Sequence, residues 1–216
     1  MDIVLAHAGL AGLPDHDDIM LAMPVLPALL MGTIVTGTLL QRRGALRAEG
    51  TLPLVLPLAI VAATLSLAAA AIHIAVLEEH ALEDVLFGVF FLAVGGAQLA
   101  WAAAYLAFPS RWLAIGGLLG NAAVIGVWLV SRTVGLPIGP TPWIAEPIAL
   151  LDVLTTTYEI GLVAALLLIL REGRGGRPPR RVSILDAFVG AGFAVVVISL
   201  VTVLALLWSA LGILGD

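Results

Sequence analysis

The chain has 216 residues, of which 61% are hydrophobic and 12% are charged, and its mean hydropathy is +1.12. Soluble domains are about half apolar and about a quarter charged, so this composition predicts a protein that is mostly embedded in a membrane. Cysteine is absent and all ten basic residues are arginine, which excludes disulfides, thiolate metal ligands, cysteine nucleophiles and lysine chemistry such as a retinal Schiff base.

Six windows are long and apolar enough to cross a bilayer, since a spanning helix needs about 20 largely apolar residues. They cover approximately residues 19–41, 53–77, 85–107, 112–131, 147–170 and 186–212. Little chain remains between them. We therefore predict a single membrane domain, residues 1–216, that is an all-α polytopic bundle of about six transmembrane helices in a lipid bilayer.

Residues 1–18 form a short arm before the first span. Their apolar run of about ten residues lacks the basic start of a secretory signal, so we expect no cleaved signal peptide. The arm ends in the acidic segment DHDD, and the first span ends before Arg42 and Arg43. We expect the arm to lie at the membrane surface.

The second span ends in the segment IHIAVLEEHALED, residues 72–84, where an apolar stretch with one histidine meets four carboxylates and a second histidine. The third span carries Gln98. The fourth carries Asn121, together with Gly116 and Gly120 in a G-x-x-x-G spacing. That spacing either marks a close helix contact or is incidental, since small residues allow two helices to approach.

Residues 132–146 contain three prolines and two glycines, which predicts an ordered loop or a re-entrant excursion rather than a helix. The fifth span holds Asp152 and Glu159. A basic linker rich in glycine and proline, residues 171–181, leads to the sixth span, whose main interior polar groups are Ser199 and Thr202. The basic loops are better explained as topology determinants near anionic lipid than as nucleic-acid contacts.

The arginines are sorted between alternate loops. If both termini lie outside the cytoplasm, the loops after the first, third and fifth spans are cytoplasmic and hold nine of the ten arginines, with only Arg132 outside. This asymmetry follows the positive-inside rule. We predict a multi-pass protein of the cell membrane with both termini outside and with its histidines at or near the outer face: His7, His16, His73 and His80.

Helical rise predicts where the polar side chains meet. His73 and Asp152 lie about 6 to 7 Å below the outer boundary, and Arg132 lies at it, so these three side chains can form an outer cluster. A deeper layer falls about 16 to 20 Å from the outside, near the bilayer middle. It consists of Ser66, Gln98, Asn121 and Glu159.

A carboxyl group at mid-membrane costs several kcal/mol if it is charged and unpaired, so such groups mark ion pathways or are protonated and hydrogen-bonded. Glu159 is therefore either a functional carrier or a neutral acid bonded to Gln98 or Asn121. Asp152, two helical turns before Glu159 on the same face, either pairs with Arg132 or takes a direct functional part.

A candidate metal site lies in the predicted outer loop. His80 and Glu83 are three residues apart, and Glu79 and Glu83 are four apart, so on a helical turn they share a face. Imidazole with carboxylates suits zinc, copper(II), iron or manganese, which makes a divalent transition metal the candidate cofactor. The alternative is a solvated acidic loop, because His73 is about 10 Å of helix away and H-E-x-x-H is absent.

Two stretches, AAIHIAVLEEH and GNAAVIGVWLVSRTVGLPIGP followed by EPIALLDVLTT, resemble segments of a group of uncharacterised multi-pass membrane proteins from bacteria with GC-rich genomes. The likeness extends over approximately residues 68–170. It implies that the four middle spans are a shared unit and that the first and last spans are less constrained. No activity is known for the group, so the resemblance implies no function.

The leading hypothesis is that a polar interior open to the outer face handles a small cation, a proton or a metal ion. His73, Asp152 and Arg132 would form an outer gate, and Glu159 would be the inner carrier. The alternative is an accessory or sensor subunit that binds a partner or a metal with its acidic outer face, and an intramembrane enzyme comes third. The small size and the lack of an internal repeat favour a homo-oligomer or a membrane partner subunit over a complete transporter.

Overall fold

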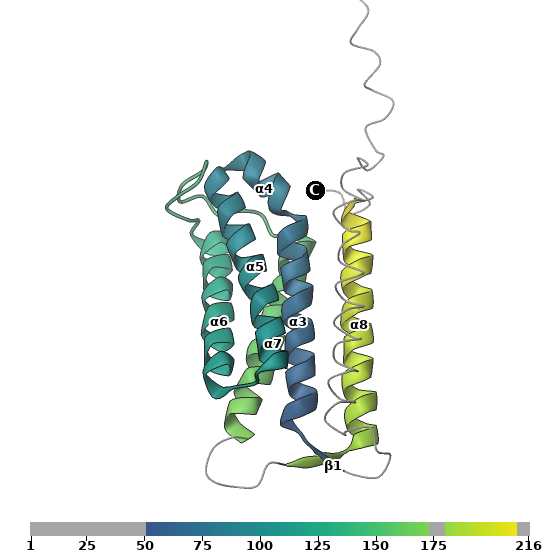
Figure 1. The fold of residues 1–216 in the computed structure, drawn as a ribbon. Coiled ribbons are helices and arrows are strands. Elements are labelled where there is room, and N and C mark those ends of the chain that lie inside the picture. The colour runs from purple at the N-terminus through teal and green to yellow at the C-terminus, as the bar shows by residue number, and fades with distance from the viewer. Residues whose placement is uncertain (1–50, 173–179, 211–216) are drawn as a thin grey trace, which may run out of the picture.

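The structure, a computed structural model, describes residues 51–172 and 180–210 (Figure 1). Five of its helices are long and apolar enough to cross a membrane, and a sixth helix, α4, is short. The chain is therefore an all-α polytopic membrane bundle. Its elements in chain order are β1 (Thr51–Pro53), α3 (Val55–Ala75), α4 (Leu77–Glu83), α5 (Val85–Ala107), α6 (Arg111–Thr133), α7 (Leu150–Glu172), β2 (Arg181–Ser183) and α8 (Ile184–Ala210).

The predicted spans from residue 53 onward match α3, α5, α6, α7 and α8 to within three residues at each end. The predicted first span, residues 19–41, and the arm of residues 1–18 lie outside the described residues. The structure differs from the prediction in two places: the acidic segment after α3 forms the separate helix α4, and short strands precede α3 and α8.

Helix α3 is the centre of the described bundle and contacts α5, α7 and α8. Its apolar window is 61% buried, whereas the window of α6 is 17% buried. Small side chains explain this position, because Ala62, Ala68 and Ala69 have no exposed surface and let three neighbouring helices approach closely. Residues of α3 are consequently held more rigidly by their surroundings than those of the peripheral α6.

The chain turns sharply where α3 gives way to α4. Val76, between the two helices, has φ −89° and ψ 2°, and α4 then lies across the end of the bundle (Figure 1). Asp84 ends α4 in an extended conformation, and its carboxylate accepts a hydrogen bond from the backbone N–H of Leu86 at 2.8 Å. This N-cap starts α5 directly after α4. The break at Val76 places His73 on α3 and His80 on α4.

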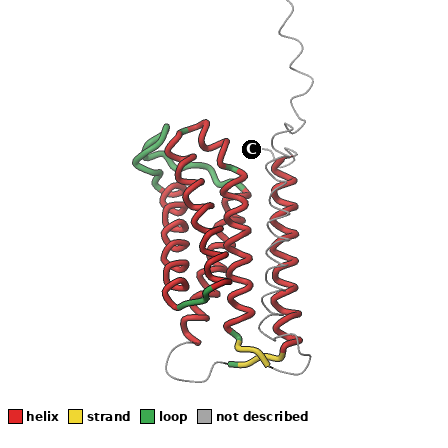
Figure 2. The backbone as a smooth tube through the Cα atoms, viewed as in Figure 1, coloured by secondary structure: helices red, strands yellow, loops and turns green. Residues whose placement is uncertain are grey.

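A two-stranded antiparallel sheet joins the starts of α3 and α8 at the opposite end of the bundle (Figure 2). Thr51 pairs with Ser183, and Pro53 pairs with Arg181. The Arg181 side chain adds two hydrogen bonds, from Nε to Thr51 Oγ1 and from a terminal nitrogen to the Thr51 carbonyl, both 2.7 Å. Strands of three residues are too short to show an alternating pattern, which is why the sequence did not predict them.

Most of the described arginines and most of the described acidic side chains lie at opposite ends of the bundle, although Glu172 and Asp186 lie at the arginine-rich end. The arginines at the end that carries the sheet are Arg111, Arg171, Arg180 and Arg181. The acidic side chains on or near α4 and in the loop between α6 and α7 are Glu78, Glu79, Glu83, Asp84 and Glu146. Arg132, at the end of α6, is the one arginine among the described residues that lies at this acidic end.

The G-x-x-x-G spacing of α6 does not mark a contact within the described residues. A Cβ added at Gly116 or Gly120 would meet no atom within 4 Å. The neighbouring Gly117 faces the bundle instead, where an added Cβ would lie 2.5 Å from the ring of Trp101. The glycine that α6 needs for packing is thus the one outside the predicted motif.

Candidate functional site

A histidine from α3 and a glutamate from α7 meet inside the bundle. His73 Nε2 lies 3.2 Å from Glu159 Oε1. Glu159 is 1% exposed and His73 is 6% exposed. A buried ionisable pair of this kind is stable only if each member satisfies the other, so the two side chains form one unit.

Two amides extend this pair toward α5 and α6. Gln98 Nε2 donates to Glu159 Oε1 at 2.9 Å and lies 3.1 Å from Asn121 Oδ1, which also accepts from it. Asn121 is fixed in turn, because its Nδ2 donates to the Gly117 carbonyl at 2.8 Å. Ser66 of α3 donates to the backbone carbonyl of Gln98 at 2.9 Å. The four groups of the predicted deep layer are therefore connected.

The contact between His73 and Glu159 spans a predicted difference in depth of about 10 Å. Side chains of an α-helix lean toward its N-terminus. Helix α3 starts at the sheet end and α7 starts at the opposite end (Figure 1), so the two side chains lean toward each other. The sequence interpretation placed His73 in the outer cluster, whereas the structure gives it a partner in the deep layer.

Close approach of α3 and α5 holds this pair in place. A Cβ added at Gly95 would lie 3.1 Å from Ile74, and 3.3 Å from both the Ala70 carbonyl and His73 Cβ. Such contacts are at the tight limit of van der Waals packing. Glycine lets the α5 backbone lie this near to His73 without a shift of the neighbouring atoms, and Gln98 follows it by three residues on the same helix.

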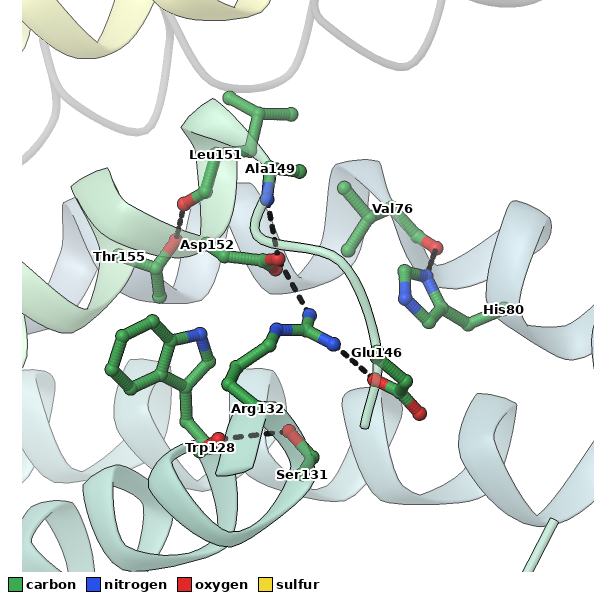
Figure 3. Close-up of polar contacts among 10 residues, drawn as sticks. All are labelled: Val76, His80, Trp128, Ser131, Arg132, Glu146, Ala149, Leu151, Asp152 and Thr155. Atoms are coloured by element: carbon green, nitrogen blue, oxygen red, sulfur yellow. Dashed lines mark hydrogen bonds and ion pairs between the residues drawn. The ribbon is translucent and has the colours of Figure 1, made fainter. Parts of the chain in front are cut away.

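Arg132 forms a second cluster nearer the acidic end of the bundle (Figure 3). One terminal nitrogen of its guanidinium pairs with Asp152 Oδ2 at 2.5 Å, and the other pairs with Glu146 Oε2. Asp152 Oδ2 also accepts the backbone N–H of Ala149 at the start of α7. The predicted pairing of Asp152 with Arg132 is present, and Glu146 from the loop joins it.

The loop that carries Glu146, residues 134–149, is folded back over the ends of the helices. The backbone N–H of Glu146 donates to the Ser131 carbonyl at 3.0 Å. Gly139, at φ 96°, lies against α5, where an added Cβ would be 2.4 Å from the Phe87 ring. Positive φ and this contact both require glycine. The prediction of an ordered loop here is confirmed.

A cavity of about 80 Å³ lies between the two clusters. Its polar lining runs from Glu146, Arg132 and Asp152 under the loop to His73 and Glu159 in the interior. Its apolar lining includes Phe87, Phe90, Phe91, Val124 and Val127. The structure thus brings His73, Arg132, Asp152 and Glu159 to one cavity, while Gln98 and Asn121 lie behind Glu159 in the hydrogen-bonded layer.

Phe91 packs against both histidines of the described residues. Its ring centroid lies 4.1 Å from that of His80 and 5.5 Å from that of His73. His80 Nδ1 lies 2.9 Å from the Val76 carbonyl, and since a carbonyl only accepts, Nδ1 carries the hydrogen. His80 therefore presents Nε2 as its free nitrogen, and it lines the cavity together with His73.

The predicted metal ligands are not gathered into a site. Among residues 51–172 and 180–210, no three histidine or carboxylate side chains are placed so that they could hold a metal ion. Glu79 and Glu83 are exposed on α4, whereas His80 is partly buried against Phe91. The shared helical face that the spacing predicted therefore gives no three-ligand cluster of His80, Glu79 and Glu83.

The geometry permits proton exchange within a net-neutral pair. With one shared proton, His73 and Glu159 carry no net charge, either as two neutral groups or as imidazolium and carboxylate. Neutrality is favoured in an apolar interior. Gaining a second proton or losing the shared one would charge the pair, and the amide of Gln98 remains a donor to Glu159 in both cases.

Sequence reasoning places Trp128 and Trp143 at the membrane interface on either side of the loop, assigns Trp128 no part in the site, and does not single out Phe91. Trp128 lies four residues before Arg132 and hence on the same face of α6, a spacing that could have identified it. Phe91 lies one turn after Phe87 and seven residues before Gln98 on α5, so it shares their face as well.

Comparison of the chain with protein-family models, curated proteins and solved structures finds no match.

Proposed function

We propose that this membrane protein binds a proton or a small cation at Glu159 and His73, reached through the cavity from the end that carries α4. The observation that carries the proposal is the almost fully buried Glu159, whose Oε1 contacts His73 and Gln98 beside a cavity with a polar lining. A carboxyl group at this depth is costly unless its charge is compensated. The imidazole of His73 supplies the compensating group, and the cavity would supply the route by which an ion reaches it.

The same proposal assigns an orientation. The sheet end, with Arg111, Arg171, Arg180 and Arg181, faces the cytoplasm in accordance with the positive-inside rule. The end that carries α4 and the loop 134–149 then faces the outside of the cell membrane, and both chain termini lie outside. Ions would reach Glu159 from the outside, past Arg132, Glu146 and Asp152.

A one-sided sensor or accessory subunit is the second candidate. Helix α7 has no charged side chain between Glu159 and Arg171, about 18 Å of helix, and the described parts of α3, α5, α6 and α8 at that depth supply none. Within the described residues the ionisable route therefore ends at Glu159. Such a site suits an ion-dependent switch that reports to a partner as well as it suits transport.

The test compares two substitutions of Glu159 in liposomes. Glu159→Gln keeps the shape and the acceptor oxygen but cannot gain or lose a proton, so we expect it to abolish proton or cation flux with normal thermal stability. Glu159→Leu removes the partner of both His73 and Gln98 and is expected to lower stability by about 1–3 kcal/mol per unsatisfied group. Glu83→Gln, an exposed acid on α4, is the matched control.

A Glu159→Gln variant with wild-type flux would contradict ion binding and leave Glu159 as a structural acid. Flux that is absent from the wild type as well, together with proton uptake that Glu159→Gln removes, would decide in favour of the sensor. We also infer that approximately residues 68–170, which contain the whole cavity lining, form the unit shared with the bacterial group named above.

A further inference from the structure

Two buried N–H donors at the cavity have no protein acceptor. The indole Nε1 of Trp128 and the guanidinium Nε of Arg132 are both shielded, and neither has a hydrogen-bond partner among the described residues. Both residues line the cavity, and the Arg132 side chain is only 10% exposed. Figure 3 shows the indole nitrogen turned toward Arg132 and Asp152. A buried donor that lacks an acceptor is unfavourable, and the cavity beside these two donors has space for one.

The charges around these donors select the kind of acceptor. A metal cation is repelled by N–H groups that point at it, and an anion is repelled by the carboxylates of Glu146 and Asp152, which outnumber the single Arg132 charge. A neutral oxygen can accept hydrogen bonds from both N–H groups and is not repelled by the two carboxylates. Water is the neutral acceptor that also donates, and cavity water with two or more polar partners is stable in protein interiors.

The size of the cavity agrees with water. A cavity that binds benzene measures about 150 Å³, and one water occupies about 30 Å³ of liquid. The 80 Å³ present here is about half of that volume and exceeds the space that one water needs. Residues of both clusters line it, including Glu159, His73 and Glu146, so waters in the cavity would lie beside both clusters.

We propose that the cavity holds a chain of waters, that Trp128 Nε1 and Arg132 Nε orient it, and that the ion bound at Glu159 and His73 is a proton rather than a metal cation. The inference rests on the proposed function and names its substrate. Phe91 packs against the rings of both His80 and His73, and no hydrogen bond joins the two imidazoles within the described residues, so in this scheme the proton travels through the water.

Each hop along the chain forms one O–H bond and breaks the next. A proton arriving at the outer water displaces a proton to its neighbour, and the innermost water passes one to the Glu159 carboxylate. No water is consumed and no redox partner is needed. Trp128 is a positioning residue in this scheme. Its indole N–H donates a hydrogen bond to a lone pair of one cavity water, and this bond orients the O–H groups of that water toward the rest of the chain and Glu159.

The experiment uses the full chain in lipid nanodiscs, with ¹⁵N-labelled tryptophan. We expect the indole proton of Trp128, assigned by its loss in Trp128→Phe, to show magnetisation transfer to long-lived water. Trp101 is the internal control, because its buried Nε1 donates to the Leu113 carbonyl at 2.8 Å and should show none. A Trp128 indole proton without a water contact would overturn the water chain.

Flux provides the second readout. Trp128→Phe should reduce proton flux, or proton uptake if no flux exists, about tenfold, the rate change that corresponds to one ordinary hydrogen bond. Trp101→Phe should leave it within about twofold of wild type after correction for folded protein. Sodium or zinc gradients at constant pH should drive no Glu159-dependent flux, and such a flux would refute the assignment of the proton. A Glu159→Gln variant with the proton flux or uptake of the wild type contradicts the proposed function itself. A Trp128→Phe variant with the flux or uptake of the wild type contradicts only this inference.

Discussion

His73 on α3 and Glu159 on α7 are 86 positions apart in the chain, and their side chains meet at 3.2 Å inside the bundle. This contact is the one side-chain hydrogen bond of His73 among the described residues, and Glu159 Oε1 has one other partner there, Gln98 Nε2. Their contributions to stability must therefore be coupled.

The coupling can be measured with a double-mutant cycle. His73→Leu leaves Glu159 with Gln98 alone and should lower the free energy of unfolding by about 1–3 kcal/mol. Glu159→Leu should cost a similar amount, while the double variant should cost less than the sum, because no stranded partner remains. Denaturant or thermal unfolding in detergent provides the readout. Additive losses would show that the two side chains do not depend on each other.

The Arg132 cluster should respond unequally to removal of its members. Arg132→Gln strands two carboxylates and should destabilise most, by about 2–4 kcal/mol. Asp152→Asn should cost less, and Glu146→Gln least, because the Glu146 side chain is 34% exposed and that of Asp152 is 20% exposed, so water replaces part of the lost pairing. Thermal unfolding of the three variants tests this order. A Glu146 variant less stable than the Arg132 variant would contradict it.

Adjacent glycines on α6 should behave oppositely. Gly117→Ala places a methyl group within 2.5 Å of the Trp101 ring and should cost about 1–3 kcal/mol through displaced packing. Gly116→Ala meets no atom within 4 Å and should be neutral or stabilise by up to about 1 kcal/mol. Equal effects in an unfolding assay would indicate that Gly116 packs against a surface outside the described residues, such as a second copy of the chain.

Topology can be tested with a reporter that is active only outside the cytoplasm. Fused after Asp216 it should be active, and fused at Gly175, between α7 and β2, it should be inactive, because the arginines of the described sheet end favour the cytoplasm. A second reporter that is active only in the cytoplasm, fused at the same two positions, is the reciprocal control. The opposite pattern would reverse the direction from which ions reach Glu159.

The long helices were predictable because membrane spanning imposes a length and an apolar composition that few other structures share. The polar layer was partly predictable, since depth follows from helical rise: Gln98, Asn121 and Glu159 were placed together and are bonded. The contact of His73 with Glu159 was missed because depth was counted at the backbone. Including the lean of side chains toward each helix N-terminus would have joined them.

Other features left no clear signal in the sequence. The strands at Thr51 and Arg181 depend on backbone pairing between segments 130 positions apart, which no local pattern encodes. The orientation of the G-x-x-x-G face depends on helix rotation, and rotation is set by neighbours rather than by the motif itself. Within residues 51–172 and 180–210 the candidate metal ligands form no three-residue cluster, because sharing a helical face brings carboxylates near one another without directing them at a common point.

The pairing of Thr51 with Ser183 has a consequence for how the protein is made. Helix α3 leaves the ribosome and can enter the bilayer long before β2 exists, so the sheet of β1 and β2 forms only after α7 and the segment Arg181–Ser183 have been synthesised. Contacts of such large sequence separation form late, because the intervening chain must first be ordered. We therefore expect a chain truncated before Arg181 to insert its earlier helices but to leave β1, at the start of α3, without its partner strand.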